Sequence, residues 1–339
     1  MTLSRRHVTA RMAATLAVTA TLPWARPARA LARTPAEAAG ALDAALERLP
    51  QLHSLQVRRG ADVVFAEAPR GGGLDAPANI KSCSKSLVAL LLGVAIDRGE
   101  VTGVDAPLRT VAPGLIPEDA TEGVGGITLE DLVTLRAGLE ATSGAHYGAW
   151  VGSNNWIAHA LRRPMVARPG GRMIYSTGST HVLGAALTEA TGKSLLAQAR
   201  ERLGQPMGFA VPPWTRDPQG YYFGGNQMAL TPRAMLDVAT MVRDGGTFDG
   251  TQVVSADWMR ASLEPRTVSP WSGMDYGYGW FLTGSGYAMA RGYGGQVIAA
   301  HPERALAVAI TSDPTQPARS GGYFGDLMDL LDGPILDLA

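Results

Sequence analysis

The sequence is poor in cysteine and in lysine. Cys83 is the only cysteine among 339 residues, which excludes an internal disulfide and a metal site built from several cysteines. Lysine occurs three times, at positions 81, 85 and 193, and the other 27 basic residues are arginine. Two of the three lysines lie in one stretch, NIKSCSKSLVALLLG at 79–93, where Lys85 begins a strongly apolar run. An ammonium group in that position needs an explanation.

The chain also lacks an excess of charge and several common motifs. Its 30 basic and 30 acidic residues balance, so no basic surface is expected for binding nucleic acid. The histidines show neither H-x-H nor H-E-x-x-H spacing, and TGKS at 191–194 lacks the upstream glycine of a phosphate loop, so we expect no metal and no other cofactor. G-x-S-x-G is absent, which argues against a nucleophile elbow with a histidine base.

Residues 1–30 have the order of an export signal. Arg5 and Arg6 stand in a basic start, an apolar centre follows, and Ala28–Ala30 forms a small-x-small ending. The arginine pair is typical of the twin-arginine route. The apolar centre is shorter than the roughly 20 residues that a membrane-spanning helix needs. We therefore expect cleavage after Ala30 and a periplasmic or secreted protein, with 25 basic and 30 acidic residues and no stable membrane anchor.

Strand patterns lie toward both ends of the chain and helical patterns lie between them. We expect helices at 32–49, 82–98 and 322–332, and strands within 52–68, 276–282, 286–302 and 305–313. This order predicts an α+β fold, in which an antiparallel sheet built from both chain ends is flanked by helices and carries an inserted all-α lobe. The expected sheet domain is 31–110 with 216–339, and the expected lobe is 111–215.

Ser82 and Lys85 are the first candidates for chemistry. Residues three apart share one face of a helix with side chains about 5–6 Å apart, so the Lys85 amine is expected within reach of the Ser82 hydroxyl. Burial and the positive end of the helix dipole favour a neutral amine, and a neutral amine can activate a serine nucleophile. The alternative is that Ser82 only caps the helix and that Lys85 reaches the surface. S-x-x-K alone is a weak motif, but its place at the start of a buried helix strengthens it.

Several segments together resemble the serine β-lactamase-related family, which includes class C β-lactamases and penicillin-recognising proteins. The helix beginning at Ser82 resembles the family's nucleophile helix, and GGRMIYSTGSTHVLGAAL (170–187) resembles the segment that carries its catalytic tyrosine. YGYGWFL (276–282) and GYGGQVIAAHPERALAVAITSD (292–313) resemble its last strands. The resemblance covers most of the chain after residue 30 and is nearest to the branch of 6-aminohexanoate-dimer hydrolases and related esterases.

The resemblance implies a β-lactamase/transpeptidase-like fold and a role for each of several residues. Ser82 would be the nucleophile, Lys85 its base, and Tyr175 the acid that protonates the leaving group. The backbone N–H of Ser82 would supply one oxyanion donor. The strand edge beside the nucleophile would be Tyr293–Gln296, where Gly294, Gly295 and Gln296 would bind substrate or supply the second oxyanion donor. Apart from the resemblance, Tyr147 in the glycine-rich loop SGAHYGAWVG is expected either as a lid residue over the pocket or as a surface aromatic of that loop.

Two departures from the family bear on the substrate. Tyr-x-Asn reads Tyr175–Thr177 here, and the strand motif lacks its usual basic residue, so partners for a β-lactam side chain and for a substrate carboxylate are expected to be missing. Losing a charge-assisted hydrogen bond costs roughly 1.5–3 kcal/mol. We therefore expect an exported serine hydrolase acting on a small ester or linear amide. A class C-type β-lactamase or D-Ala-D-Ala peptidase is the alternative, and a non-turnover acyl-binding protein is the second. Lys81 and Cys83 receive no role, and the oligomeric state stays open.

Overall fold

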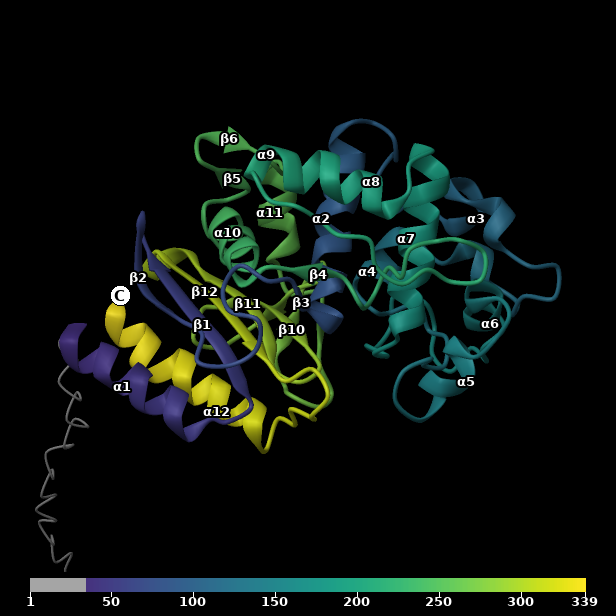
Figure 1. Ribbon diagram of the computed structural model, residues 1–339. Coiled ribbons are helices and arrows are strands. Elements are labelled where there is room, and N and C mark those ends of the chain that lie inside the picture. Colours follow the sequence, from purple (N-terminus) through teal and green to yellow (C-terminus); the bar gives the residue numbers. More distant parts are fainter. Residues whose placement is uncertain (1–34) are drawn as a thin grey trace, which may run out of the picture. The chain divides into compact units, whose positions relative to one another are not determined.

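The computed structural model describes residues 35–339, and its main element is an eight-stranded antiparallel sheet (Figure 1). The strand order is β2-β1-β12-β11-β10-β9-β8-β7. The bounds are β1 Leu52–Arg59, β2 Asp62–Glu67, β7 Thr267–Val268, β8 Asp275–Tyr276, β9 Phe281–Leu282, β10 Ala288–Gly292, β11 Gln296–His301 and β12 Leu306–Ser312. Two small sheets pair β3 (Ala78–Asn79) with β4 (Ala229–Leu230) and β5 (Thr247–Phe248) with β6 (Thr251–Gln252). The predicted fold class is confirmed.

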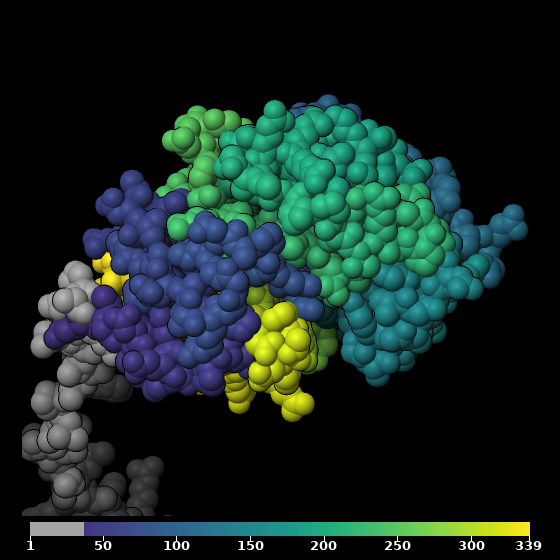
Figure 2. Space-filling model, in the orientation of Figure 1, coloured from purple at the N-terminus to yellow at the C-terminus, as the bar shows by residue number. Residues whose placement is uncertain are grey.

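Segments from opposite ends of the chain pair with each other as the second and third strands of this sheet. Leu55 of β1 lies opposite Ile310 of β12, and β2 returns along β1 after a turn closed by the pair Arg59 and Asp62. Figure 2 shows the purple N-terminal residues beside the yellow C-terminal ones on the same part of the surface. The expected sheet from both chain ends is therefore present, and residues 35–339 lie within one compact unit.

The two faces of the sheet pack against different helices because side chains alternate along each strand. In β12, Val308 and Ile310 join a core with α1 (Pro35–Arg48) and α12 (Tyr323–Leu330), whereas Ala307 and Ala309 face α10 (Pro232–Arg243). Alanine on one face lets α10 lie close to the strands, and the larger residues fill the space under α1 and α12.

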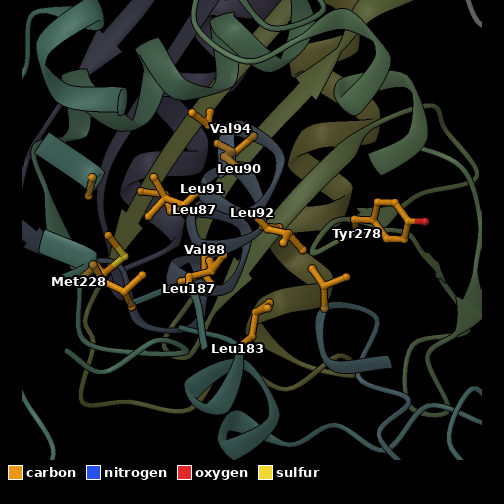
Figure 3. Close-up of a cluster of buried hydrophobic side chains, with 14 of the residues drawn as sticks. Leu87, Val88, Leu90, Leu91, Leu92, Val94, Leu183, Leu187, Met228 and Tyr278 are labelled. Atoms are coloured by element: carbon orange, nitrogen blue, oxygen red, sulfur yellow. The ribbon is translucent and has the colours of Figure 1, made fainter. Parts of the chain in front are cut away.

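The helix α2 (Ser84–Asp97) lies in the centre of the second core. Residues 84–95 are all buried, so the helix is covered on every side, as its apolar sequence predicts. Figure 3 shows Leu87, Leu90 and Leu91 of this helix among Leu183 and other apolar side chains. A rigid, fully packed helix is a stable support for the residues at its beginning.

Short helices and loops fill the chain between α2 and α10. The bounds are α3 Leu108–Val111, α4 Leu129–Val133, α5 Tyr147–Val151, α6 Trp156–Leu161, α7 Thr177–Thr191, α8 Leu195–Ala199 and α9 Gln205–Met207, and α11 (Ala256–Ser262) follows α10. The longest, α7, packs against both α2 and α4 (Figure 1). Its C-cap is Gly192, in the left-handed conformation with φ 65°, as a helix end commonly requires.

One expected strand is wrong. The segment 276–282 is not a single strand but the end of β8, a turn and the two residues of β9. Gly279 takes φ +81° there and lies against Ala89 and Ser86 of α2, where a Cβ atom would be 2.7 Å from the Ala89 Cβ. The close approach of the turn to α2 therefore breaks the strand.

The predicted export signal at 1–30 lies outside the described residues. Within residues 35–339, no helix combines the length and the hydropathy that crossing a membrane requires.

Candidate active site

Ser82 lies in a 3₁₀ turn, Lys81–Cys83, that leads directly into α2. Lys81 takes φ 50°, which is uncommon for a residue with a side chain. Two hydrogen bonds hold this backbone: the Lys81 N–H donates to Asn79 Oδ1 at 2.9 Å, and the Ser84 hydroxyl donates to the Lys81 carbonyl at 2.6 Å. The conformation sets the direction in which the turn presents Ser82.

The amine of Lys85 lies beside the Ser82 hydroxyl, as the spacing predicts. Its Nζ is 3.2 Å from Ser82 Oγ, 3.2 Å from Thr177 Oγ1 and 2.7 Å from the Gly225 carbonyl oxygen. The residue is only 3% exposed, and this burial lowers the pKa of Lys85 from 10.5 to about 7. A large share of the amine is therefore neutral near pH 7, when it can accept a proton.

Tyr175 meets the same serine from the loop before α7. Its hydroxyl is hydrogen-bonded to the Ser82 side chain, and burial raises the pKa of Tyr175 above its ordinary value of 10. The Lys85 Nζ lies 5.1 Å from the centre of the Tyr175 ring. Trp271, which is 65% exposed, stacks edge-on against this ring at 6.1 Å. The structure thus brings together the three residues that the sequence singled out for catalysis, Ser82, Lys85 and Tyr175.

The residues at the strand edge beside Ser82 differ from the predicted ones. β10 ends at Gly292, which approaches the Ile80 carbonyl so closely that a Cβ atom would lie 2.4 Å from the oxygen. Gly294 and Gly295 form the hairpin turn with φ +84° and +93°, and they lie against Asp313–Pro314 and Tyr323 instead. The Gln296 side chain is buried and bonded to the Ser312 backbone. The segment Arg291–Tyr293 lines the space beside Ser82, and Gly294, Gly295 and Gln296 do not.

A cavity of about 790 Å³, here called the Ser82 cavity, opens in front of these groups. Polar lining residues include Lys81, Ser143, Thr177, Asn226 and Gln227, and the aromatic ones are Tyr147, Tyr175, Trp271, Phe281 and Tyr293. Tyr147, the expected lid residue, accepts a hydrogen bond from Asn226 Nδ2 at 3.0 Å. Among the described residues that line the cavity there is no aspartate or glutamate. Aromatic walls with a few polar groups suit a small organic molecule.

Arg291 contradicts the expectation that a basic partner for a substrate carboxylate is missing. Its side chain lines the Ser82 cavity, with the guanidinium carbon 3.4 Å from the Phe324 ring centre. Two N–H groups bond to Ser320 Oγ at 3.2 Å and to the Ala318 carbonyl at 3.1 Å. Within the described part of the chain, Arg291 makes no ion pair with a carboxylate. Burial lowers the pKa of Arg291 to about 10, so it is charged at neutral pH.

A hydroxyl with an amine and a phenol beside it, as at Ser82, is an arrangement that can support acyl transfer. Thr177 stands at the third position of the family's Tyr-x-Asn motif, where asparagine would supply an amide. Its hydroxyl contacts Lys85 and Ser143. Residues 35–339 contain no group of three or more His, Cys, Asp or Glu side chains placed to hold a metal ion. Cys83 points away from the cavity and is fully buried, with its Sγ 3.5 Å from the Gln296 carbonyl.

Comparison with known proteins agrees with this geometry. The family model described as beta-lactamase matches residues 42–330. One solved structure with a similar fold is a protein named provisionally as a 6-aminohexanoate-dimer hydrolase, from Bacillus anthracis, with a TM-score of 0.72, 16% identity, and coverage of 88% of this chain and 81% of that one. A second is EstCE1, a hydrolase with promiscuous acyltransferase activity, with a TM-score of 0.72, 16% identity, and coverage of 88% and 98%. A third is a D-stereospecific amidohydrolase from Streptomyces sp., with a TM-score of 0.65, 16% identity, and coverage of 88% and 98%. At these identities the structures demonstrate a shared fold, and the family model covers most of the chain. This chain belongs to the beta-lactamase family of serine hydrolases.

Proposed function

We propose that this protein hydrolyses a small ester or linear amide through an acyl-enzyme on Ser82. The observation that carries the proposal is the contact of one hydroxyl, that of Ser82, with both a buried lysine and a half-buried tyrosine. A serine hydroxyl is a weak nucleophile until an adjacent base takes its proton. Lys85, with its pKa lowered to about 7, is such a base at neutral pH.

In the proposed acylation step, Ser82 Oγ bonds to the substrate carbonyl carbon while its proton moves to the neutral Lys85 amine. The tetrahedral oxyanion accepts hydrogen bonds from backbone N–H groups, for which we propose Ser82 and Tyr293, the residue after β10. The leaving alcohol or amine departs with a proton from Tyr175, and the Lys85 ammonium returns a proton to Tyr175. Water then attacks the acyl-serine, giving its proton to the Tyr175–Lys85 pair, and the free acid leaves as Ser82 regains its proton.

We further propose that the preferred substrate carries a carboxylate, and that Arg291 binds it. Two of the five guanidinium N–H groups are used by Ser320 and Ala318, so donors remain for a ligand. Arg291 is half-buried, and a substrate carboxylate in the Ser82 cavity would supply it with a charge-assisted hydrogen-bond partner. Lys81, also on the cavity wall, adds positive charge near it.

Export is a separate proposal that rests on residues 1–30 alone. Cell fractionation of the full chain and of the variant with Arg5 and Arg6 both changed to lysine tests it. Periplasmic or secreted protein for the wild type and retention of the variant in the cytoplasm are expected. Equal distribution of the two would contradict the twin-arginine route.

The catalytic proposal is tested with Ser82→Ala and a substrate panel. The panel holds p-nitrophenyl butyrate, p-nitrophenyl hydrogen glutarate, a linear amide dimer, a chromogenic cephalosporin and a D-Ala-D-Ala peptide. We expect turnover of at least one ester or linear amide, loss of that turnover in Ser82→Ala, and a transient acyl adduct by intact-mass spectrometry. A permanent adduct without turnover would instead support the acyl-binding alternative. Turnover restricted to the cephalosporin or the peptide would support the β-lactamase or peptidase alternative.

The role of Arg291 is tested by comparing a substrate that carries a carboxylate with one that does not. We measure kcat/KM for the glutarate half-ester relative to the butyrate ester. Arg291→Gln is expected to lower this ratio about tenfold to a hundredfold, because a hydrogen bond to a charged group is worth roughly 1.5–3 kcal/mol. Arg291→Lys keeps the charge but loses the fork geometry, so an intermediate ratio is expected. Arg304→Gln, which removes an exposed arginine from the β11–β12 turn, is the matched control. An unchanged ratio in Arg291→Gln would disprove carboxylate recognition and leave the catalytic proposal standing.

A further inference from the structure

A histidine and a carboxylate are paired in the core close to Lys85, and the proposed mechanism does not use them. His181 lies on α7, one turn after Thr177, and Asp217 lies in the loop between α9 and β4. The distance between His181 Nε2 and Asp217 Oδ2 is 2.9 Å, and both side chains are 0% exposed. Aromatic rings of Trp150, Trp156 and Phe223 surround His181.

Hydrogen bonds fix the proton on this pair. The Gly224 N–H, which can only donate, points at His181 Nδ1 at 3.3 Å. Nδ1 is therefore the acceptor, so Nε2 carries the proton and donates it to Asp217. Asp217 Oδ1 accepts two more bonds, from the N–H groups of Gln219 at 3.0 Å and Tyr221 at 2.8 Å. The carboxylate thus ties its own loop together and holds one tautomer of the imidazole.

The next residue of the loop contacts the catalytic lysine. Gly225 follows Gly224, and its carbonyl oxygen is the nearest acceptor of the Lys85 amine, at 2.7 Å. A side chain would be crowded at both positions, because a Cβ atom on Gly224 would lie 2.5 Å from the Thr180 carbonyl oxygen and one on Gly225 would lie 2.9 Å from Thr177 Cγ2. The loop backbone is therefore pressed against α7 and the amine, and His181 of α7 accepts the hydrogen bond that holds Gly224 there.

The hydrogen bond from Lys85 Nζ to the Gly225 carbonyl determines the orientation of the amine. A neutral amine has two N–H groups and one lone pair. Since the Gly225 carbonyl can only accept, one N–H must point to it, and the Thr177 hydroxyl at 3.2 Å is placed to accept the second. The lone pair then faces the Ser82 hydroxyl, which is the direction that proton abstraction requires. If the Gly225 carbonyl moved away, the amine could rotate and present an N–H to Ser82 instead.

We propose that His181 and Asp217 are positioning residues that, through Gly224 and Gly225, orient the Lys85 amine to accept the Ser82 proton. The inference rests on the proposed function. An apolar side chain would fill the space among the three aromatic rings at a lower desolvation cost than this buried polar pair. His181 is bonded to Gly224, and the next residue, Gly225, contacts Lys85. This placement offers a catalytic explanation for the buried pair.

The experiment compares kcat, KM and the rate at which a fluorophosphonate labels Ser82, all per folded molecule at a temperature well below each Tm. Asp217→Asn keeps the volume of the side chain but has an acceptor on one side only. It must either lose the bonds from Gln219 and Tyr221 or invert the His181 tautomer, which would set an Nδ1–H against the Gly224 N–H. His181→Phe removes the acceptor altogether, and His181→Asn offers Oδ1 in place of Nδ1. Trp156→Phe is the control, because it disturbs the same aromatic cluster without touching Gly224.

We expect Asp217→Asn and His181→Phe to lower kcat and the labelling rate about tenfold to a hundredfold, with KM changed less than about threefold, as for a catalytic group displaced by about 1 Å. His181→Asn should recover part of the loss, and Trp156→Phe should lower Tm but keep kcat. If Asp217→Asn matches Trp156→Phe in kcat and labelling, the pair is structural and the inference is wrong, whether or not His181→Phe folds. If the wild type neither hydrolyses esters nor is labelled at Ser82, the proposed function has failed, and this inference fails with it.

Discussion

The lowered pKa of Lys85 leads to a quantitative expectation for the dependence of activity on pH. With an ordinary lysine pKa of 10.5, about 0.03% of the amine would be neutral at pH 7, whereas a pKa of about 7 makes about half of it neutral. Burial therefore raises the share of competent base on the order of a thousandfold. The sign follows from the mechanism: the ammonium form below pH 7 cannot accept the Ser82 proton, and the amine above pH 7 can.

The assay is kcat/KM for p-nitrophenyl butyrate from pH 5 to 9.5, followed at the isosbestic wavelength of nitrophenol. Activity should rise tenfold per pH unit below the midpoint, pass its half-maximum near pH 7, and reach a plateau about a hundred times the pH 5 value. No fall is expected below about pH 10, because burial raises the pKa of Tyr175 above its ordinary value.

Two lysine variants separate this explanation from others. Lys85→Met should remove both the activity and the rising limb, and Lys193→Met, which changes an exposed lysine paired with Glu201, should keep both. A midpoint below about pH 5 would indicate a carboxylate base. A rate independent of pH between 5 and 9 would also refute the assignment of Lys85 as the base.

The remaining predictions concern packing and the second partner of the amine. Gly93→Ala should lower the free energy of unfolding by more than about 2 kcal/mol, because its Cβ atom would lie 2.3 Å from the Trp258 ring. Gly40→Ala should raise the free energy of unfolding by about 0.5–1 kcal/mol, because alanine favours the helix and nothing lies within 4 Å of its Cβ atom. Urea denaturation measures both, and equal effects would show that the ring can move aside. Thr177→Val should lower kcat about tenfold, because it removes the hydroxyl beside Lys85, and Thr177→Ser should restore it; steady-state kinetics would contradict this if Val and Ser variants behaved alike.

The parts of the candidate site that lie close in sequence could be predicted from the sequence. Ser82 and Lys85 are three residues apart at the start of a helix, and that spacing alone brings an amine to a hydroxyl. Tyr175 is 90 positions further on, and only the resemblance of its segment to a family predicted that it joins them. The burial of helix α2 was predictable, because a helix that is hydrophobic on every side is normally buried.

Other features depend on contacts that no local pattern records. The Gly294–Gly295 pair indicates a close backbone approach, but it forms the hairpin turn, so the edge beside Ser82 lies two or three residues earlier. Arg291 stands in a short strand among small and apolar residues, and which face of the strand it occupies depends on the register of the whole sheet. His181 and Asp217 are 36 residues apart, and their pairing follows from the packing of a loop on α7.

The pairing of β1 with β12 has a consequence for how this protein reaches its native state. These neighbouring strands are separated by about 250 residues of chain, so the sheet has a high contact order and is expected to form slowly. Ser82 is synthesised well before β10, which supplies Arg291, and before β12, which closes the sheet. During synthesis on the ribosome Ser82 is therefore present before its strand edge exists. A chain that stops before β12 should carry Ser82 but lack the assembled candidate site.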